Sequence, residues 1–247
     1  SYEEIPIACR MDEAVQSEYK RIENALVQVL RSDRRAAQKI LSAYLNLLTV
    51  YPDQPYDQKP ILYPDSDVPI VEPENIGDAD TLGEKEQRTL EIVRAAIQNR
   101  ERALIYTSWV RTDSQQKLKK LLTDEGYRTE ILTDKIKTTD REDWVQKKLA
   151  AGMQVLIVNP SLVETGLDLN AFTTLVFYSM GYKLFTLRQA SRRSWRINQK
   201  APAVKVYMLY YEDTMQQKCL KLMASKLAVA GLIEGNFSEE GLAAMSD

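Results

Sequence analysis

The spacing of hydrophobic residues divides this chain into three stretches. Between about Met11 and Val50, apolar residues recur every three or four positions, which predicts two amphipathic helices. Ser32 or Asp33 is suited to cap the start of the second helix. The two apolar stripes consist of Val15, Tyr19, Ile22, Leu26, Val29 and Leu30 in the first helix, and Ile40, Leu41, Tyr44, Leu45 and Leu48 in the second.

Residues 51–80 differ from this pattern in composition. They hold most of the chain's nine prolines together with many acidic residues. Because proline lacks a backbone N–H and charged residues resist burial, we predict an extended, irregular connection here and a domain boundary at its end.

After residue 80 the pattern alternates between helical and strand periods. Capping-box pairs, Thr81 with Glu84 and Thr139 with Glu142, predict the starts of two helices. Further helices are predicted near 114–125 and 214–230. Short apolar runs predict strands at 103–106, 128–132, 155–158, 175–178 and 204–210. Strands separated by helices in this way predict an α/β fold, a three-layer domain whose mainly parallel sheet is covered on both faces.

Polar residues follow two of the predicted strands, where a parallel sheet binds its ligands. Ser108 and Arg111 follow the first strand and offer a hydroxyl and a cation to a phosphodiester backbone. In the segment Asn159–Leu169, Gly166 permits a close backbone approach and Asp168 can accept a hydrogen bond from a ribose hydroxyl. Such residues are also typical of an ordinary turn or helix cap.

A cluster of arginines precedes the last predicted strand. Gln189, Arg193 and Arg196 are spaced by four and then three positions, which makes them neighbours on one face of a predicted helix. Fixed guanidinium groups suit a polyphosphate whose charge spreads during phosphoryl transfer. A solvated helix with surface ion pairs has the same pattern.

Composition narrows the chemistry. The 247 residues include no histidine and only two cysteines, which excludes histidine-based triads and structural zinc, and we predict no metal site. With a net charge of -2, nucleic-acid binding requires a local basic patch. No apolar run reaches the roughly 18 residues of a membrane span. The first residues also lack a signal-peptide pattern, so we predict a soluble cytoplasmic protein with no membrane partner.

Three segments resemble known motifs in their order and spacing. LIYTSW (Leu104–Trp109), VLIVNPSLVETGLDL (Val155–Leu169) and QASRRSWRINQ (Gln189–Gln199) are similar to motifs IV, V and VI of the second RecA-like lobe of superfamily-two helicases. The third is similar to the Swi/Snf form QAxDRxHRIGQ, from which it departs at Arg192, Trp195 and Asn198. The resemblance covers about residues 100–211 and, more loosely, residues 11–50, which resemble the connector after the first lobe.

The resemblance implies a site shared between two lobes. By motif position, Arg196 would be an arginine finger on the γ-phosphate of ATP, Arg193 would be its partner, and Gln189 would orient the pair. Gly166 and Asp168 would face the nucleotide. The residues implied to contact the nucleic-acid backbone are Ser108, Arg111, Ser161 and Thr165.

The resemblance also implies a partner lobe. The sequence contains no GxxxxGK[ST] phosphate-binding loop and no strand that ends in a DExx acid pair. We therefore expect the C-terminal lobe of a longer ATPase that couples ATP hydrolysis to movement along nucleic acid. ATP and Mg²⁺ would be bound mostly by the N-terminal RecA-like lobe, and this chain alone would bind no cofactor and hydrolyse no ATP. The predicted partners are that lobe and nucleic acid, with double-stranded DNA implied by the Swi/Snf form.

Three ranges are predicted from these patterns. Residues 1–80 would form the helical connector and proline-rich linker, residues 81–235 the RecA-like domain, and residues 236–247 a tail.

Two other functions remain open. A non-enzymatic RecA-like module could bind protein through its acidic connection and helical arm, which the negative net charge favours slightly. An unrelated doubly wound enzyme with a small-molecule substrate ranks last, because no glycine-rich fingerprint follows the first predicted strand.

Overall fold

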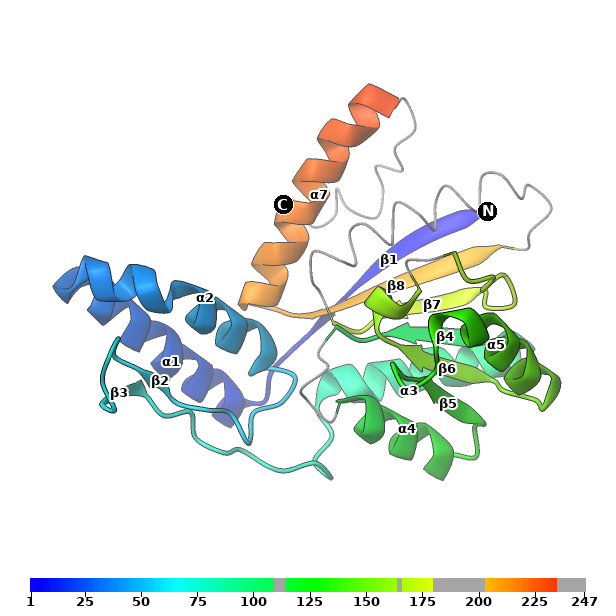
Figure 1. Cartoon of the computed structure of the whole chain (residues 1–247), viewed down its shortest axis with the longest axis horizontal. Coiled ribbons are helices and arrows are strands. Elements are labelled where there is room, and N and C mark those ends of the chain that lie inside the picture. The colour runs from blue at the N-terminus through cyan, green and yellow to red at the C-terminus, as the bar shows by residue number, and fades with distance from the viewer. Residues whose placement is uncertain (109–113, 164–165, 180–202, 235–247) are drawn as a thin grey trace.

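Within the described residues, a six-stranded sheet forms the core, and each of its strands is parallel to its neighbours (Figure 1). The computed structural model describes residues 1–108, 114–163, 166–179 and 203–234, of which 225–234 are described by their backbone alone. The strands are β1 (Tyr2–Cys9), β4 (Ala103–Tyr106), β5 (Thr129–Leu132), β6 (Val155–Val158), β7 (Thr174–Phe177) and β8 (Val204–Tyr211). Their order in the sheet is β1-β8-β7-β4-β6-β5.

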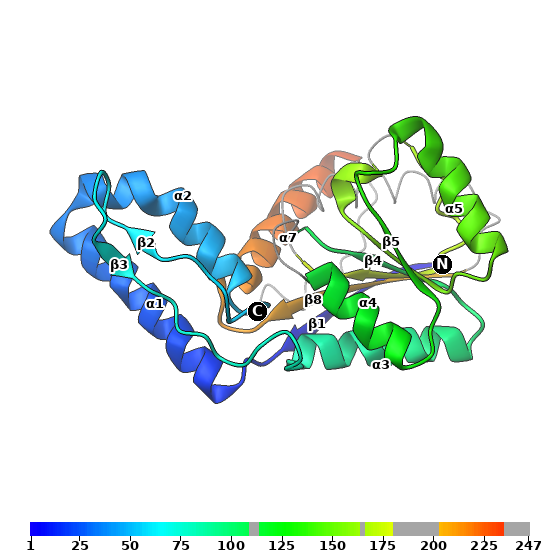
Figure 2. The ribbon, with the colours of Figure 1, turned by 60° about the horizontal axis from the view of Figure 1, so that its bottom comes forward.

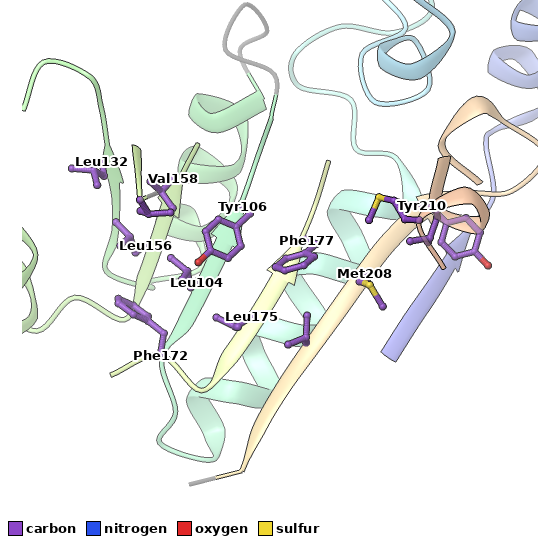
Figure 3. Packing of buried hydrophobic residues seen from close by; sticks show 14 of the residues in the cluster. Leu104, Tyr106, Leu132, Leu156, Val158, Phe172, Leu175, Phe177, Met208 and Tyr210 are labelled. Carbon is purple, nitrogen blue, oxygen red and sulfur yellow. The ribbon is translucent and has the colours of Figure 1, made fainter. Parts of the chain in front are cut away.

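Both faces of the sheet are buried. Successive side chains of a strand point to opposite faces, and Leu104 and Tyr106 of β4 accordingly join one hydrophobic cluster while Ala103 and Ile105 join another. Figure 3 shows the first cluster, in which the rings of Tyr106 and Phe177 meet edge to face with centroids 5.4 Å apart. Burial on both faces explains why β4, β6 and β7 have continuous apolar sequences.

Helices on each side complete three layers. α3 (Glu84–Gln98) and α4 (Ser114–Asp124) pack on one face of the sheet, and α5 (Arg141–Ala150) and α7 (Met215–Glu234) pack on the other (Figures 1 and 2). Two short 3-10 helices, Thr138–Asp140 and Pro160–Leu162, precede α5 and follow β6. The predicted three-layer α/β fold is therefore confirmed.

The edge strand β1 was not predicted. It runs parallel to β8, from Tyr2 opposite Val204 to Cys9 opposite Tyr211. β1 contains Pro6, and proline has no backbone N–H to donate to a neighbouring strand. A strand with proline is therefore expected at the edge of a sheet, where one side of the strand has no partner. The range 1–80 that was predicted as the connector thus includes one strand of the sheet.

Two helices form an arm that projects from the sheet (Figure 1). α1 (Glu13–Ser32) and α2 (Arg34–Val50) confirm the two predicted helices. Asp33, and not Ser32, caps α2, since its carboxylate accepts hydrogen bonds from the backbone N–H groups of Arg35 (3.1 Å) and Ala36 (3.0 Å). The apolar stripes were predicted too wide: Leu30, Leu41 and Leu45 are exposed and do not belong to the core of the arm.

The proline-rich connection is partly regular. Within it, β2 (Ile61–Leu62) and β3 (Pro69–Val71) form a short antiparallel hairpin, which lies across the two arm helices (Figure 2). Arg21 of α1 donates a hydrogen bond to the Glu72 carbonyl (2.6 Å), and Lys39 of α2 lies 3.6 Å from the Asp65 carboxylate. The connection is therefore packed against the arm along one of its faces. Of the described helices, none is long and apolar enough to cross a membrane.

Candidate functional site

The carboxyl ends of three strands lie side by side. The backbone N–H of Thr107 donates to the carbonyl of Val158 (3.1 Å), and that of Tyr178 donates to the carbonyl of Tyr106 (3.0 Å). The residues that follow β7, β4 and β6 therefore start from neighbouring points on one edge of the sheet. This edge is where ligands bind in open parallel sheets.

Ser108 leaves β4 at this edge. Its hydroxyl is buried and has no hydrogen-bond partner within the described residues. The preceding Thr107 hydroxyl accepts a hydrogen bond from the Gln115 amide (2.8 Å), which fixes the start of α4 beside it. Ser108 thus lies at the place predicted for a backbone contact, with its hydroxyl unpaired among the described residues.

The residues after β6 form a tight turn. The Asn159 side-chain oxygen accepts hydrogen bonds from the backbone N–H (3.0 Å) and the hydroxyl (2.9 Å) of Ser161. Arg141 of α5 donates to the Leu162 carbonyl (3.1 Å) and holds the turn from the other side. Ser161 thus lies at the predicted edge, with its hydroxyl proton directed to Asn159.

Gly166 has a backbone conformation that favours glycine. Its φ is +87°, and among the described residues other than its chain neighbours no atom lies within 4 Å of the point where a Cβ would stand. The glycine is therefore required by its dihedral angle, and no described side chain covers it.

Asp168 is exposed and its loop is fastened to α5. Its backbone N–H donates to the Glu142 carboxylate (3.0 Å), and its own carboxylate accepts from the backbone N–H of Asn170 (3.0 Å). The predicted capping box of Thr139 with Glu142 is therefore not formed. Glu142 instead holds this loop. One oxygen of Asp168 is used in a local turn, while the side chain stays accessible.

The sequence did not indicate a second polar group at the same edge, nearer to the arm. The Lys85 ammonium is fully buried and lies 2.6 Å from the Asp53 carboxylate and 2.9 Å from the side-chain oxygen of Gln216. It also lies 5.1 Å from the ring centre of Tyr178 and 5.3 Å from that of Tyr211. Burial raises the pKa of both tyrosines well above the usual value, so both phenols stay neutral.

The Lys85 group joins four parts of the chain. Gln216 of α7 accepts from the backbone N–H of Tyr211 (3.0 Å) and donates to the carbonyl of Thr49 at the end of α2 (2.9 Å). Beside it, Glu86 and Lys117 form a second buried ion pair at 3.2 Å. Arm, connection, α3 and α7 are therefore fixed to one another at the sheet edge.

A pocket lies next to these pairs, between the base of the arm and the sheet. It is lined by residues that include Asp12, Asp53, Tyr56, Glu86, Lys117 and Tyr211. In the part of the chain that the structure describes, no group of side chains has the composition of a metal site.

The structure describes four of the nine predicted site residues. Ser108, Ser161, Gly166 and Asp168 all lie at the carboxyl edge, on loops that start from neighbouring strands. The five that lie outside the described residues are Arg111, Thr165, Gln189, Arg193 and Arg196.

The geometry defines the class of domain. It is a RecA-like α/β domain with candidate ligand loops at the carboxyl edge of its parallel sheet. Residues 84–198 match the helicase conserved C-terminal domain family.

Several known proteins are similar to this chain. The chain is 23% identical over 143 residues to an uncharacterized ATP-dependent helicase of Mycoplasma pneumoniae, and the match spans 58% of this chain and 14% of that protein. Among solved structures, it is similar to the Sulfolobus solfataricus SWI2/SNF2 ATPase C-terminal domain (TM-score 0.66, 17% identity), covering 92% of this chain and 87% of the other. It is likewise similar to the C-terminal part of the Fun30 ATPase domain (TM-score 0.62, 13% identity; 90% and 89% covered).

A longer relative shows how much of such a protein this chain spans. The S. solfataricus SWI2/SNF2 ATPase core in complex with dsDNA matches with a TM-score of 0.68 and 19% identity, over 99% of this chain and 47% of that one. The predicted resemblance to the C-terminal RecA-like lobe of superfamily-two helicases is thereby confirmed: residues 84–198 match the helicase C-terminal domain family, and the fold is similar to that of SWI2/SNF2 ATPase C-terminal domains.

Proposed function

We propose that this chain acts as the C-terminal lobe of an ATP-dependent translocase on double-stranded DNA. The observation that carries the proposal is the convergence of Ser108, Ser161, Gly166 and Asp168 at one edge of the sheet, on loops whose sequences resemble helicase motifs IV and V and lie within the matched residues 84–198. Double-stranded DNA is favoured because a structurally similar SWI2/SNF2 core was solved with it.

The nucleotide would approach the loop of Gly166 and Asp168. The open space over Gly166 fits a close approach of phosphate or ribose to the backbone, and the accessible Asp168 carboxylate can accept a hydrogen bond from a ribose hydroxyl. ATP with Mg²⁺ supplies the γ-phosphoryl group that is transferred to water, and the partner lobe would hold most of its phosphates. Arg196, Arg193 and Gln189 would come from the segment that follows β7 in the chain.

The arginines have a specific task in this proposal. Negative charge spreads over the γ-phosphoryl oxygens in the transition state, and a guanidinium that faces them stabilises that charge. Arg196 would make this contact, Arg193 would support it, and Gln189 would fix their orientation. Because no phosphate-binding loop occurs in these 247 residues, the chain by itself would not turn over ATP.

The nucleic-acid contacts would come from the same edge. Ser108 offers a hydroxyl that has no partner in the described residues, and Arg111 and Thr165 lie close to the described edge in sequence. The hydroxyl of Ser161 donates to Asn159, so Ser161 would reach a phosphate only after its hydroxyl turns away. Opening and closing of the two lobes on ATP would then move these contacts along one strand.

The test uses a protein in which this chain is joined to its N-terminal lobe. Arg196→Ala should reduce DNA-stimulated ATP hydrolysis by about a thousandfold or more, while the affinity for a fluorescent ATP analogue changes little. Arg188→Ala removes a neighbouring arginine that lies about 80° around the predicted helix from Arg196, off the proposed stripe, and serves as the matched control. Unchanged turnover in Arg196→Ala, or equal losses in both variants, would rule out the finger role.

A further inference from the structure

One face of the helical arm carries an apolar stripe that the rest of the described chain leaves uncovered. Val27 and Leu30 of α1 are 38% and 43% exposed, and Leu41 and Leu45 of α2 are 40% and 37% exposed. On a helix, residues three or four positions apart are neighbours, so each pair forms a continuous stripe.

The two stripes lie on the same side of the arm. Lys39 contacts Asp65 of the segment between β2 and β3, and Leu41 is two positions further, about 200° around α2. Glu18 accepts from the Glu74 backbone N–H, and Val27 is nine positions further, about 180° around α1. Both helices therefore present their exposed apolar residues on the side opposite to the β2–β3 hairpin.

Basic residues border this surface. Between Ala25 and Pro52 the only acidic residue is Asp33, whose carboxylate caps α2. Arg31 lies four positions from Val27, and Arg34 lies seven positions from Leu41, which places each beside a stripe. Neither arginine forms an ion pair within the described residues.

The helix dipole accounts for Arg31, a cation in the last turn of α1, but not for Arg34. A cation at the amino end of a helix opposes the helix dipole, and Arg34 is the first residue of α2, whose first turn has no acidic residue. Exposed leucines likewise add nothing to the core of the arm. An apolar centre with arginines at its border is instead typical of a protein-binding surface.

We propose that this surface, formed by Val27, Leu30, Leu41 and Leu45 with Arg31 and Arg34, binds an acidic amphipathic helix of a protein partner. Two antiparallel helices offer a groove in which a third helix can bury its apolar face. Carboxylates beside that face would pair with Arg31 and Arg34, which have no carboxylate partner among the described residues. DNA is the less suitable occupant, because phosphates gain nothing from four apolar side chains.

The proposal does not depend on the motor function. In this proposal the arm is a docking site for a protein partner. The buried Lys85–Asp53 pair holds the arm in a fixed position relative to the sheet edge. A partner bound there would therefore move with this lobe.

The experiment measures the binding of three probes to the whole 247-residue chain by fluorescence anisotropy. The first probe is a synthetic amphipathic helix with leucine at positions a and d and glutamate elsewhere. The second has lysine in place of glutamate, and the third is a short DNA duplex. We expect the glutamate peptide to bind at least about tenfold more tightly than the lysine peptide, with an affinity that falls as salt rises.

Variants then locate the binding surface. Leu41→Gln with Leu45→Gln, and separately Arg31→Glu with Arg34→Glu, should each weaken binding of the glutamate peptide about tenfold or more. Val68→Gln is the matched control, since Val68 is an apolar residue on the opposite, hairpin side that is 57% exposed. Arg35→Glu is the control for charge. All six positions are exposed, so thermal unfolding should show that every variant folds.

Three outcomes of the peptide measurements would overturn the proposal. They are the absence of glutamate-peptide binding, equal binding of the lysine peptide, and losses in the two controls as large as those in the stripe variants. Binding of the DNA duplex that depends on Arg31 and Arg34 but not on Leu41 and Leu45 would assign the surface to phosphate contacts and would also overturn it.

Discussion

The ammonium of Lys85 on α3 lies 2.6 Å from the carboxylate of Asp53, and both side chains are almost completely buried. Asp53 lies just after the helical arm, so the pair joins the arm to the sheet domain. A buried ion pair gains little net stability, but removing one partner leaves the other charge in a medium of low polarity. The pair should therefore act as a strict constraint on where the arm lies.

Replacing Lys85 should destabilise the fold strongly. Lys85→Met removes the positive charge that Asp53 contacts, and we expect a loss of about 3 to 5 kcal/mol in the free energy of unfolding, measured with denaturant. Lys120→Met is the matched control, because the ion pair of Lys120 with Asp80 is largely exposed and should contribute little to stability. Adding Asp53→Leu to Lys85→Met should recover part of the loss. Similar small effects of both lysine substitutions would show that the Lys85 pair is not a constraint.

Glu18 should make the stability of the arm depend on pH. Hydrogen bonds from Arg21 lower the pKa of the Glu18 carboxyl from its usual value of 4.5, with a further contribution from the backbone N–H of Glu74. A lowered pKa in the folded state adds stability that is fully present above the unfolded value and is lost as pH falls through the folded one. Glu18→Gln should thus cost about 1 to 3 kcal/mol at neutral pH. The difference in the free energy of unfolding between Glu18→Gln and the unmodified chain should shrink as the pH is lowered below about 4.5.

Arg21→Met provides a second measurement for the same carboxylate. It removes the main cause of the lowered pKa, so it should reduce the pH dependence in acid as Glu18→Gln does. Unfolding curves at several pH values would check both variants. A difference between Glu18→Gln and the unmodified chain that stays constant down to strongly acid pH would contradict this account.

The sequence predicted the central strands well because burial on both faces produces continuous apolar runs. The runs at 103–106 and 155–158 coincide with β4 and β6, and the other three match their strands to within one residue at each end. β1 was missed because Glu3, Glu4 and Pro6 interrupt its apolar pattern. Its place in the sheet depends on pairing with β8, about two hundred residues away in the chain, which no local pattern records.

The Lys85 group could not be predicted for a similar reason. Glu84, Lys85 and Glu86 are consecutive charged residues, a pattern typical of an exposed helix start, yet Lys85 and Glu86 are buried. Their burial depends on partners that tertiary packing brings close, such as Asp53 and Lys117. The predicted start of α3 at Thr81 was wrong as well, because Glu86 accepts a hydrogen bond from Gly83 and the helix begins at Glu84.

Gly166 should be needed for catalysis beyond its effect on stability. Gly166→Ala forces a side chain into a positive φ of 87°, which should cost about 1 to 2 kcal/mol. Gly126 at the end of α4 is a close match, with a φ of 88° and likewise no atom within 4 Å of a Cβ. In a protein with both lobes, the two alanine variants should lose similar stability, while only Gly166→Ala strongly lowers DNA-stimulated ATP hydrolysis. Equal hydrolysis in both would place Gly166 outside the nucleotide site.

Arg111 should contribute one charge contact to a DNA phosphate. Each such contact releases about one counterion, so Arg111→Ala should reduce the slope of log affinity against log salt by about one, and by a similar amount for any DNA sequence. Arg94 is the matched control. It lies in the second half of α3, toward the end that leads into the start of β4 and thus away from the carboxyl edge of the sheet, and it forms an ion pair with Glu125 at 3.3 Å. Titrations of a DNA duplex into the two-lobe protein at several salt concentrations would measure both slopes. If Arg94→Ala changes the slope as much as Arg111→Ala, the phosphate contacts do not lie at the carboxyl edge, and the proposed DNA path is wrong.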